Sequence, residues 1–375
     1  MKKIAIVTWT RWRNYGTILQ SLALQKVVQR LGYDAYVLRD INIRFDYEIE
    51  NYKAPTITER VKARWNHLLH SPKLSPFNIY AKKLTDRCEN FRLRYIKYWD
   101  VSFDNSDLNK IEENFDAFIC GSDQIWTSAD DLFSSYYFLD FVKHKPKISY
   151  APSISKNNYP QDKLAKMQVW LYSFKSVSVR ENLGKQVLSR IYKNNIEVCL
   201  DPTLLLSGKE WVELLQLTKE PEDYVFCYFL GNQTWYKQES IAFCEKMGLN
   251  MVFPPMIEAD FDSGTPEYSP DPKEFLELIL NAKYVLTDSF HAFIFSFLFR
   301  KEVFVFARFI DGDSASENSR VEEFSKSLGL QDRFIKEKGA ILQPASTIDY
   351  DYADNAIGLR RKESMKYLEN SLINL

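Results

Sequence analysis

The stretch YVLTDSFHAFIFS, residues 284–296, shows how this chain is built. An apolar run typical of a buried strand leads, through three polar residues, into an apolar run typical of a helix. Asp288, Ser289 and His291 therefore lie where a strand passes directly into a helix. Unpaired N–H groups at a helix start attract phosphate or carboxylate, and ligands of α/β folds bind at strand ends. His291 belongs either to an anion-handling site or to the core, bonded there to a neighbouring carbonyl.

The same alternation of strand and helix runs outward from this stretch in both directions. Short apolar segments predict strands at 3–9, 33–39, 115–120, 147–151, 176–180, 196–200, 224–230, 250–253, 284–287 and 303–307. Periodic segments predict helices at 17–31, 162–174, 183–193, 235–247, 272–281, 291–299, 319–328 and 352–371. The pattern indicates an α/β fold with two Rossmann-like domains facing a cleft.

The alternation also suggests the domain boundaries. We expect a first domain over residues 1–205, a second over 206–350, and a C-terminal helix over 351–375. Residues 41–110 interrupt the α/β pattern, so we expect a mainly helical, basic insertion there. Between residues 56 and 98 there are ten basic and three acidic residues. This segment is interpreted either as a patch for a peripheral membrane contact or as a helical pair with a solvated basic face.

Composition excludes several classes of protein. The net charge of −1 argues against nucleic-acid binding by the whole chain. The five cysteines are scattered, so we expect reduced core thiols and no metal site. The N-terminus enters a strand at once, and no apolar run reaches the length of a membrane span. We expect a cytoplasmic protein, either free or at the inner face of the membrane.

Seven segments, in order, resemble the polysaccharide pyruvyl transferase family. They are NYGTILQSLALQ at 14–25, DAFICGSDQIW at 116–126, YYFLDF with KISYAPS at 136–153, SVRE at 178–181, LDPTLLL at 200–206, DSFHAFIFS at 288–296 and NSRVEEF at 318–324. The resemblance implies a two-domain fold like that of GT-B glycosyltransferases. It implies transfer of the enolpyruvyl group of phosphoenolpyruvate onto two hydroxyls of a sugar, in a glycan or a lipid-linked precursor, as a pyruvate ketal.

The charges and proton transfers of a phosphoenolpyruvate donor indicate which residues are candidates for the site. Arg180, in the SVR segment, suits a donor anion because a guanidinium binds oxyanions through two N–H groups at once; the alternative is a surface arginine at a strand end. His291 suits a general acid or a phosphate stabiliser. Asp123 either accepts the sugar hydroxyl proton or binds the acceptor, and its alternative is a turn or helix cap. Together Arg180 and His291 are expected to concentrate positive potential around the donor.

The remaining candidates are expected to bind substrate around these three. They are Ser289, Asp288, Asn14, Gly16, Gly121, Ser122 and Arg320. Gly121 permits a tight turn, and Asp288 or Ser289 alternatively caps the helix of His291. Asp201, before Pro202, is expected to fix the turn between the domains. We expect no cofactor and no metal, with phosphoenolpyruvate as the donor.

One departure from the family pattern concerns the donor. The residue two before the histidine is arginine in better-studied branches and is Ser289 here; Arg308 and Arg320 are candidates to replace that charge. Two other functions stay open: a GT-B-type glycosyltransferase that uses a nucleotide sugar, and a non-catalytic carbohydrate-binding relative.

Overall fold

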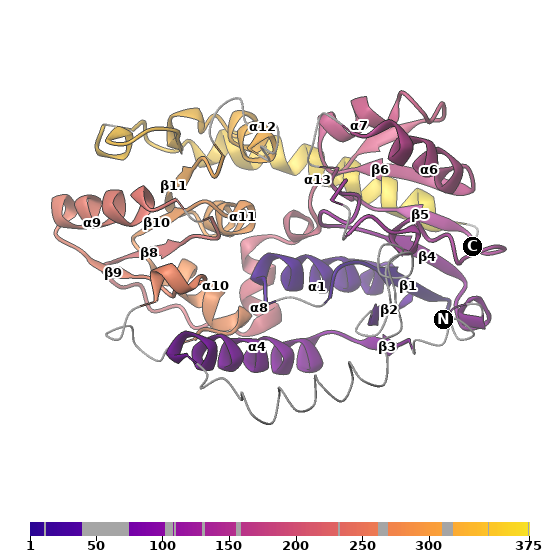
Figure 1. Ribbon diagram of the computed structural model, residues 1–375, viewed down its shortest axis with the longest axis horizontal. Helices are drawn as coiled ribbons and strands as arrows, with labels where there is room; N and C mark the ends of the chain where they lie inside the picture. The colour runs from indigo at the N-terminus through magenta and orange to yellow at the C-terminus, as the bar shows by residue number, and fades with distance from the viewer. Residues whose placement is uncertain are drawn as a thin grey trace, which may run out of the picture.

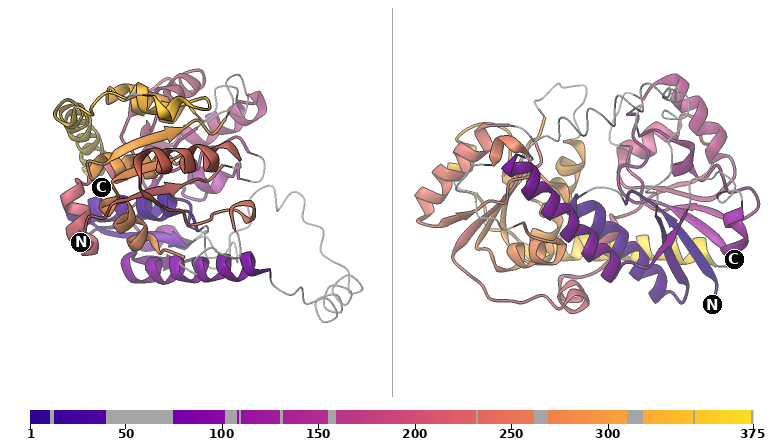
Figure 2. Two further views of the ribbon diagram at one scale, coloured as in Figure 1. Left: turned by 90° about the vertical axis from the view of Figure 1, so that its left-hand side faces the viewer. Right: turned by 60° about the horizontal axis from the view of Figure 1, so that its bottom comes forward.

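The computed structural model describes most of the chain. The described residues are 1–10, 13–39, 75–101, 108, 110–129, 132–154, 159–231, 233–261, 269–309, 318–343, 345–373 and 375. They form two lobes, each built on a parallel sheet, and Figures 1 and 2 show the lobes side by side.

The first lobe contains seven strands in the order β3-β2-β1-β4-β5-β6-β7. The strands are β1 (Lys3–Val7), β2 (Asp34–Arg39), β3 (Tyr98–Asp100), β4 (Ala117–Cys120), β5 (Lys147–Ser149), β6 (Phe174–Val179) and β7 (Ile196–Val198). The helices of this lobe include α1 (Tyr15–Arg30), α4 (Pro76–Tyr95), α6 (Gln161–Leu171) and α7 (Asn182–Leu188). Side chains of β1 alternate between the two faces, so both faces are covered by buried apolar residues.

The second lobe contains five strands in the order β12-β11-β10-β8-β9. The strands are β8 (Tyr224–Tyr228), β9 (Asn250–Val252), β10 (Tyr284–Thr287), β11 (Glu302–Phe306) and β12 (Phe334–Ile335). The helices are α8 (Gly208–Leu215), α9 (Trp235–Met247), α10 (Pro272–Asn281), α11 (Phe290–Leu298) and α12 (Ser319–Ser327), with α13 (Tyr350–Leu372) at the end of the chain. Every described strand pair is parallel, which confirms two Rossmann-like domains in a GT-B-like arrangement.

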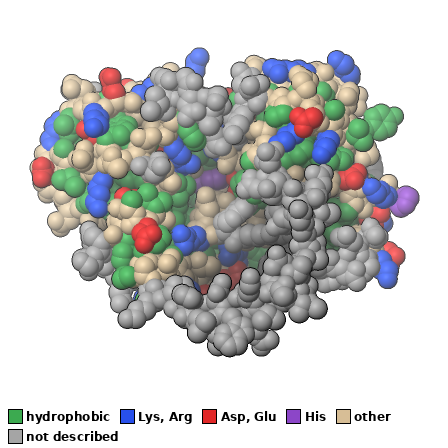
Figure 3. Space-filling view, in the orientation of Figure 1, with side chains coloured by type: hydrophobic (Ala, Val, Ile, Leu, Met, Phe, Trp, Pro, Cys, Tyr) green, Lys and Arg blue, Asp and Glu red, His purple; other side chains and the backbone are tan. Residues whose placement is uncertain are grey.

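The strand orders determine where ligands have access. The order reverses between β1 and β4 in the first sheet and between β8 and β10 in the second. In open α/β sheets the crevice at such a reversal, at the carboxyl ends of the strands, is the usual ligand site. Gly121, Ser122 and Asp123 follow β4, while Asp288 and Ser289 follow β10. Figure 3 shows a hollow between the two lobes with a histidine and basic side chains on its walls.

The segment expected to be an insertion is described over residues 75–101, 108 and 110, and its residues 41–74, 102–107 and 109 lie outside the described part. Residues 76–95 form one helix, α4, as expected. Residues 98–100, however, form strand β3, which pairs with β2 and extends the sheet. The sequence interpretation missed this strand because three residues are too few to show a period.

Several basic residues in and just after α4 are paired with acidic residues. Lys82 pairs with Asp86, and Lys97, just after the helix, pairs with Asp34. Arg87 reaches Glu274 of the second lobe at 2.5 Å, and the buried Arg92 pairs with Glu89. In the described half of the predicted patch, much of the positive charge is therefore matched within the molecule.

One apolar cluster joins the two lobes. It contains residues of β1 and α1 from the first lobe, α10 and α11 from the second, and α13. Tyr15 of α1 stacks on Phe275 of α10 with ring centroids 4.4 Å apart, and its hydroxyl donates to the Pro270 carbonyl. Helix α13 begins beside the second lobe and ends on the first, where the Tyr367 hydroxyl donates to the Ser149 carbonyl (Figure 1). The contact between the lobes is thus part of the core.

All five cysteines are buried and unpaired. Burial raises the pKa of Cys88 and of Cys199 to about 12. Since the thiolate is the reactive form, we expect the folded protein to react very slowly with iodoacetamide at pH 8, and the urea-unfolded protein to react at five sites. Mass spectrometry of labelled protein measures this, and rapid labelling of the folded protein would show that these thiols are accessible.

Candidate active site

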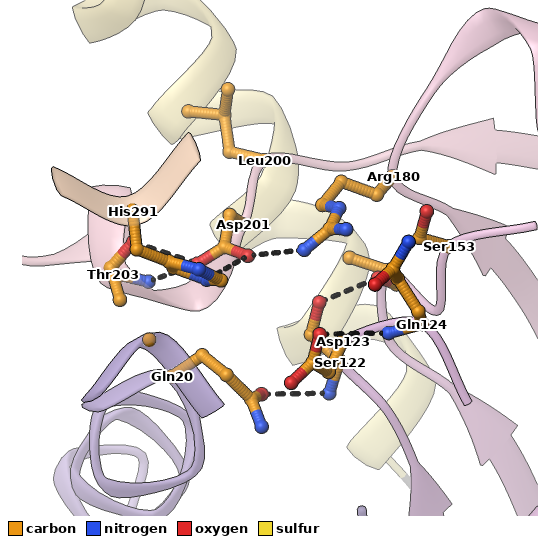
Figure 4. A network of polar contacts seen from close by, with 12 residues as sticks. Gln20, Ser122, Asp123, Gln124, Ser153, Arg180, Leu200, Asp201, Thr203 and His291 are labelled. Carbon is orange, nitrogen blue, oxygen red and sulfur yellow. Dashed lines mark hydrogen bonds and ion pairs between the residues drawn. The ribbon is translucent and has the colours of Figure 1, made fainter. Parts of the chain in front are cut away.

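The candidate site is organised around a buried carboxylate, that of Asp201. The chain leaves β7 and begins the short 3-10 helix η3 (Pro202–Leu205), for which Asp201 is the N-cap. Its Oδ1 accepts hydrogen bonds from the backbone N–H and the hydroxyl of Thr203, at 3.0 and 2.7 Å. Its Oδ2 lies 2.8 Å from Arg180 Nη1 and 3.3 Å from His291 Nε2 (Figure 4). One carboxylate therefore joins Arg180 of the first lobe to His291 of the second.

The charges in this cluster stabilise one another. Burial disfavours the charged form of Asp201, but the His291 imidazole and the Arg180 guanidinium outweigh it and hold the pKa of Asp201 well below its usual range. Burial likewise disfavours the Arg180 guanidinium, yet the carboxylates of Asp201, Glu181 and Asp123 raise the pKa of Arg180. The sequence predicted that Arg180 and His291 concentrate positive potential. In the structure the carboxylates of Asp201, Glu181 and Asp123 balance that positive charge.

Arg180 lies deep in the protein. Its side chain is 3% exposed, so the alternative of a surface arginine is wrong. It follows β6 directly, and its guanidinium lies 5.1 Å from the centre of the Phe290 ring in the second lobe. Arg320 of α12 approaches the same ring from 5.9 Å. Arg180 and Arg320, far apart in the sequence, therefore converge on one aromatic side chain.

His291 lies in the first turn of α11, as the sequence predicts. Ser289 caps this helix, accepting a hydrogen bond from the Ala292 N–H at 3.4 Å. The imidazole packs directly against α1, and a Cβ atom at position 16 would lie 2.1 Å from His291 Nδ1. Gly16 therefore makes room for the histidine. His291 is buried, but its polar neighbour is the Asp201 carboxylate and not a backbone carbonyl.

Asp123 lies across the site from Arg180, after β4 (Figure 4). Its Oδ2 accepts a 2.6 Å hydrogen bond from the Thr17 hydroxyl, and its Oδ1 accepts one from the Gln124 N–H. Gly121 is needed before it, because a Cβ atom there would lie 2.0 Å from the Tyr150 carbonyl oxygen. The Ser122 hydroxyl donates to the Ala151 carbonyl. Asp123 is the side chain of this loop that faces Arg180 (Figure 4).

Two of the predicted substrate-binding residues have structural partners instead. Asn14 caps α1, and its side chain accepts from the Gly16 and Thr17 N–H groups. The Asp288 carboxylate accepts from the Leu230 and Gly231 N–H groups, and Arg308 Nε lies 3.1 Å from it. These partners saturate Asp288 and hold Arg308 beside it. In this structure Arg308 is therefore engaged with Asp288.

Comparison with known proteins identifies the family of this chain. The model of the family described as "Polysaccharide pyruvyl transferase" matches residues 14–308. The chain belongs to the polysaccharide pyruvyl transferase family. Membership implies a transferase that modifies a polysaccharide. No curated protein matches the chain.

The solved structures similar to this family member have low sequence identity to it. A putative UDP-N-acetylglucosamine 2-epimerase from Listeria monocytogenes is 12% identical over 98% of this chain and 90% of that chain, with a TM-score of 0.47. UDP-GlcNAc 2-epimerase from Methanocaldococcus jannaschii is 10% identical over 95% and 92%, with a TM-score of 0.49. The E. coli heptosyltransferase WaaC with ADP is 11% identical over 96% and 99%, with a TM-score of 0.39.

Sequence reasoning underestimated Asp201 and missed Thr17 in this pyruvyl transferase family member. Asp201 does begin the turn between the domains, as expected, but it also contacts both candidate cationic residues. A signal was present, because Asp201 directly follows a buried segment, as Asp123 and Asp288 do. Within the described ranges, no three His, Cys, Asp or Glu side chains are grouped as metal ligands, and no helix has the length and apolarity needed to cross a bilayer.

Replacing Asp201 tests the central carboxylate. Since Asp201→Asn leaves a buried guanidinium without its closest charge partner, we expect a loss of about 3 kcal/mol in the free energy of unfolding at pH 7. The folded-state pKa is lowered, so the stabilisation is present above the unfolded-state pKa of about 3.9 and is lost as the pH falls toward the folded-state value. Urea unfolding should show the difference narrowing below pH 4; a difference that does not depend on pH would contradict this account.

Replacing Gly16 tests the close approach of α1 to His291. Because the added Cβ atom would overlap the imidazole, Gly16→Ala should lower the urea midpoint by an amount equivalent to about 1–3 kcal/mol. Gly358→Ala is the matched control, since a Cβ atom there, in α13, meets nothing within 4 Å. The control should be neutral or more stable by up to about 1 kcal/mol. Equal effects at the two positions would show that the histidine is not held against α1.

Proposed function

We propose that this protein transfers the enolpyruvyl group of phosphoenolpyruvate onto two hydroxyls of one sugar, forming a pyruvate ketal. The observation that supports this most is the convergence of Arg180 and His291, from different lobes, on Asp201. These are the residues to which the family resemblance assigns the donor. The acceptor in this proposal is a sugar of a surface polysaccharide or of its lipid-linked precursor in the cytoplasm.

The reaction joins two hydroxyl oxygens of the sugar to one carbon of the donor. A proton reaches the methylene carbon of phosphoenolpyruvate, and a sugar hydroxyl adds to the adjacent carbon and loses its own proton. A second hydroxyl of the same sugar then displaces phosphate from that carbon, and its proton leaves with the phosphate. The products are the ketal and inorganic phosphate, without any change in oxidation state. A cationic centre develops at the reacting carbon, and negative charge develops on the departing phosphate.

The residues of the site suit these demands. Arg180 is held in place by Asp201 and keeps N–H groups for an oxyanion. His291 is oriented by Asp201 through Nε2, and it acts either as general acid or as a stabiliser of the phosphate. Asp123 faces Arg180, and in this proposal its carboxylate accepts the proton of the attacking hydroxyl. Groups fixed in advance by buried contacts stabilise a transition state without reorganising.

The nucleotide-sugar alternative has less support. A glycosyltransferase of this architecture is expected to present an acidic residue for the ribose near the helix start in its second lobe. Asp288 is the acidic residue at that place, and its oxygens are engaged by the Leu230 and Gly231 N–H groups and by Arg308. The peripheral membrane contact also lacks support from residues 75–98, where Lys82, Arg87 and Lys97 are paired with acidic residues.

The test is to incubate the pure protein with phosphoenolpyruvate and a panel of glycosides. We expect release of phosphate together with a mass gain on one glycoside that matches a pyruvate ketal. His291→Ala should lower this rate by a factor of about 100 to 10,000, as loss of a general acid or base does. His144→Ala is the control, because His144 is exposed and remote from Asp201. Turnover of a UDP- or GDP-sugar in place of phosphoenolpyruvate would refute the proposal, and full activity of His291→Ala would favour a non-catalytic role for that residue.

A further inference from the structure

We propose that a small pocket at the junction of the lobes, lined by Arg180, Arg320 and Arg360, binds the phosphate end of the donor. This inference rests on the proposed function for the identity of the donor. It adds Arg360, which lies outside the motifs of the sequence, and it separates the phosphate position from the position of His291.

Four parts of the chain form the pocket. Arg180 and Glu181 come from the end of β6, and Leu200, Asp201 and Leu204 come from the crossing between the lobes. Phe290, Arg320, Glu323 and Phe324 come from the second lobe, and Arg360 comes from α13. The pocket offers about 30 Å³, which is space for a small group. It therefore suits one end of a small donor, while the rest of that donor extends outside it.

Arg180 brings unused N–H groups to this pocket. Its Nη1 donates to Asp201, but its Nε and Nη2 have no hydrogen-bond acceptor among the described residues, although the side chain is 3% exposed. Its Nε has an ion-pair contact with Glu181 Oε2 at 3.7 Å, which is too long for a hydrogen bond. A buried guanidinium N–H without an acceptor is costly, and most such groups in folded proteins have a partner. A phosphate oxygen in the pocket would supply the acceptor.

Arg360 brings a further cation. In the described part of the chain it has no carboxylate within ion-pair distance and no side-chain hydrogen bond. Its neighbour Arg361 instead donates to the Leu204 carbonyl, so the two arginines have different functions. Arg320 lines the opposite wall beside Phe290. Three guanidinium groups thus approach one small space from β6, α12 and α13.

Three acidic residues also line the pocket, and their contacts explain why an anion can still bind. Asp201 is engaged by Thr203, Arg180 and His291. Glu181 accepts hydrogen bonds through Oε1 from the Ser153 hydroxyl and the Ile154 N–H, and its Oε2 lies 3.7 Å from Arg180 Nε. Glu323 accepts a hydrogen bond from Asn182. The formal charges of the lining balance, so binding depends on N–H groups aimed at one oxyanion and not on net charge.

The test uses the full-length protein and measures binding of inorganic phosphate, phosphoenolpyruvate and pyruvate by calorimetry. Phosphate and phosphoenolpyruvate should bind, and pyruvate, which has only the carboxylate, should bind far more weakly. Arg360→Gln should weaken both phosphate-containing ligands by a factor of about ten to one hundred, the usual effect of losing a hydrogen bond to a charged group. Arg360→Lys, which keeps the charge, should recover part of the affinity.

Lys362→Gln is the matched control, because it removes the same charge from the exposed face of the same helix and should leave the affinities unchanged. Equal affinities of Arg360→Gln and the control would overturn the subsite, as would binding of pyruvate without binding of phosphate. The two proposals fail separately. If phosphate binding depends on Arg360 but no ketal forms, the subsite is supported and the proposed function is refuted. If ketal forms and the KM for phosphoenolpyruvate is unchanged in Arg360→Gln, the proposed function is supported and the subsite is refuted.

Discussion

The carboxylate of Asp201 is the contact on which the rest of the site depends. It is buried. One oxygen accepts hydrogen bonds from the Thr203 N–H and hydroxyl, and the other accepts one from Arg180 and lies 3.3 Å from His291 Nε2. A buried guanidinium is tolerated only when its charge is paired. Asp201 therefore makes it possible to keep Arg180 charged in the interior and to fix the imidazole beside it.

This arrangement exists only while the lobes are together. Arg180 and Asp201 belong to the first lobe and its exit, and His291 belongs to α11 of the second. The lobes are held by an apolar cluster that includes α1, α10, α11 and α13, and Gly16 lets α1 approach the imidazole closely. Figure 4 shows the resulting network, in which side chains from both lobes face a common space. Packing between the lobes and chemistry at the site are thus properties of the same interface.

Local sequence patterns were sufficient for much of the fold and for part of the site. The apolar segments at 284–287 and 224–230 predicted strands because burial on both faces leaves long apolar runs, and Ser289 before an apolar helix predicted the position of His291. Strand β3 was missed because it is too short to carry a pattern. The role of Asp201 and the saturation of Asp288 were missed because both depend on partners distant in the chain, which no local spacing encodes.

The course of α13 affects how the chain acquires its structure during synthesis. Domains generally fold in the order in which the ribosome releases them. Here α13 is joined to the first lobe by hydrogen bonds: the Ser364 hydroxyl accepts from the Leu200 N–H, the Tyr367 hydroxyl donates to the Ser149 carbonyl, and the Leu372 carbonyl accepts from the Tyr33 hydroxyl. The first lobe is therefore synthesised before a helix that packs on it. Until α13 has been synthesised, the nascent first lobe must stay compact without these contacts.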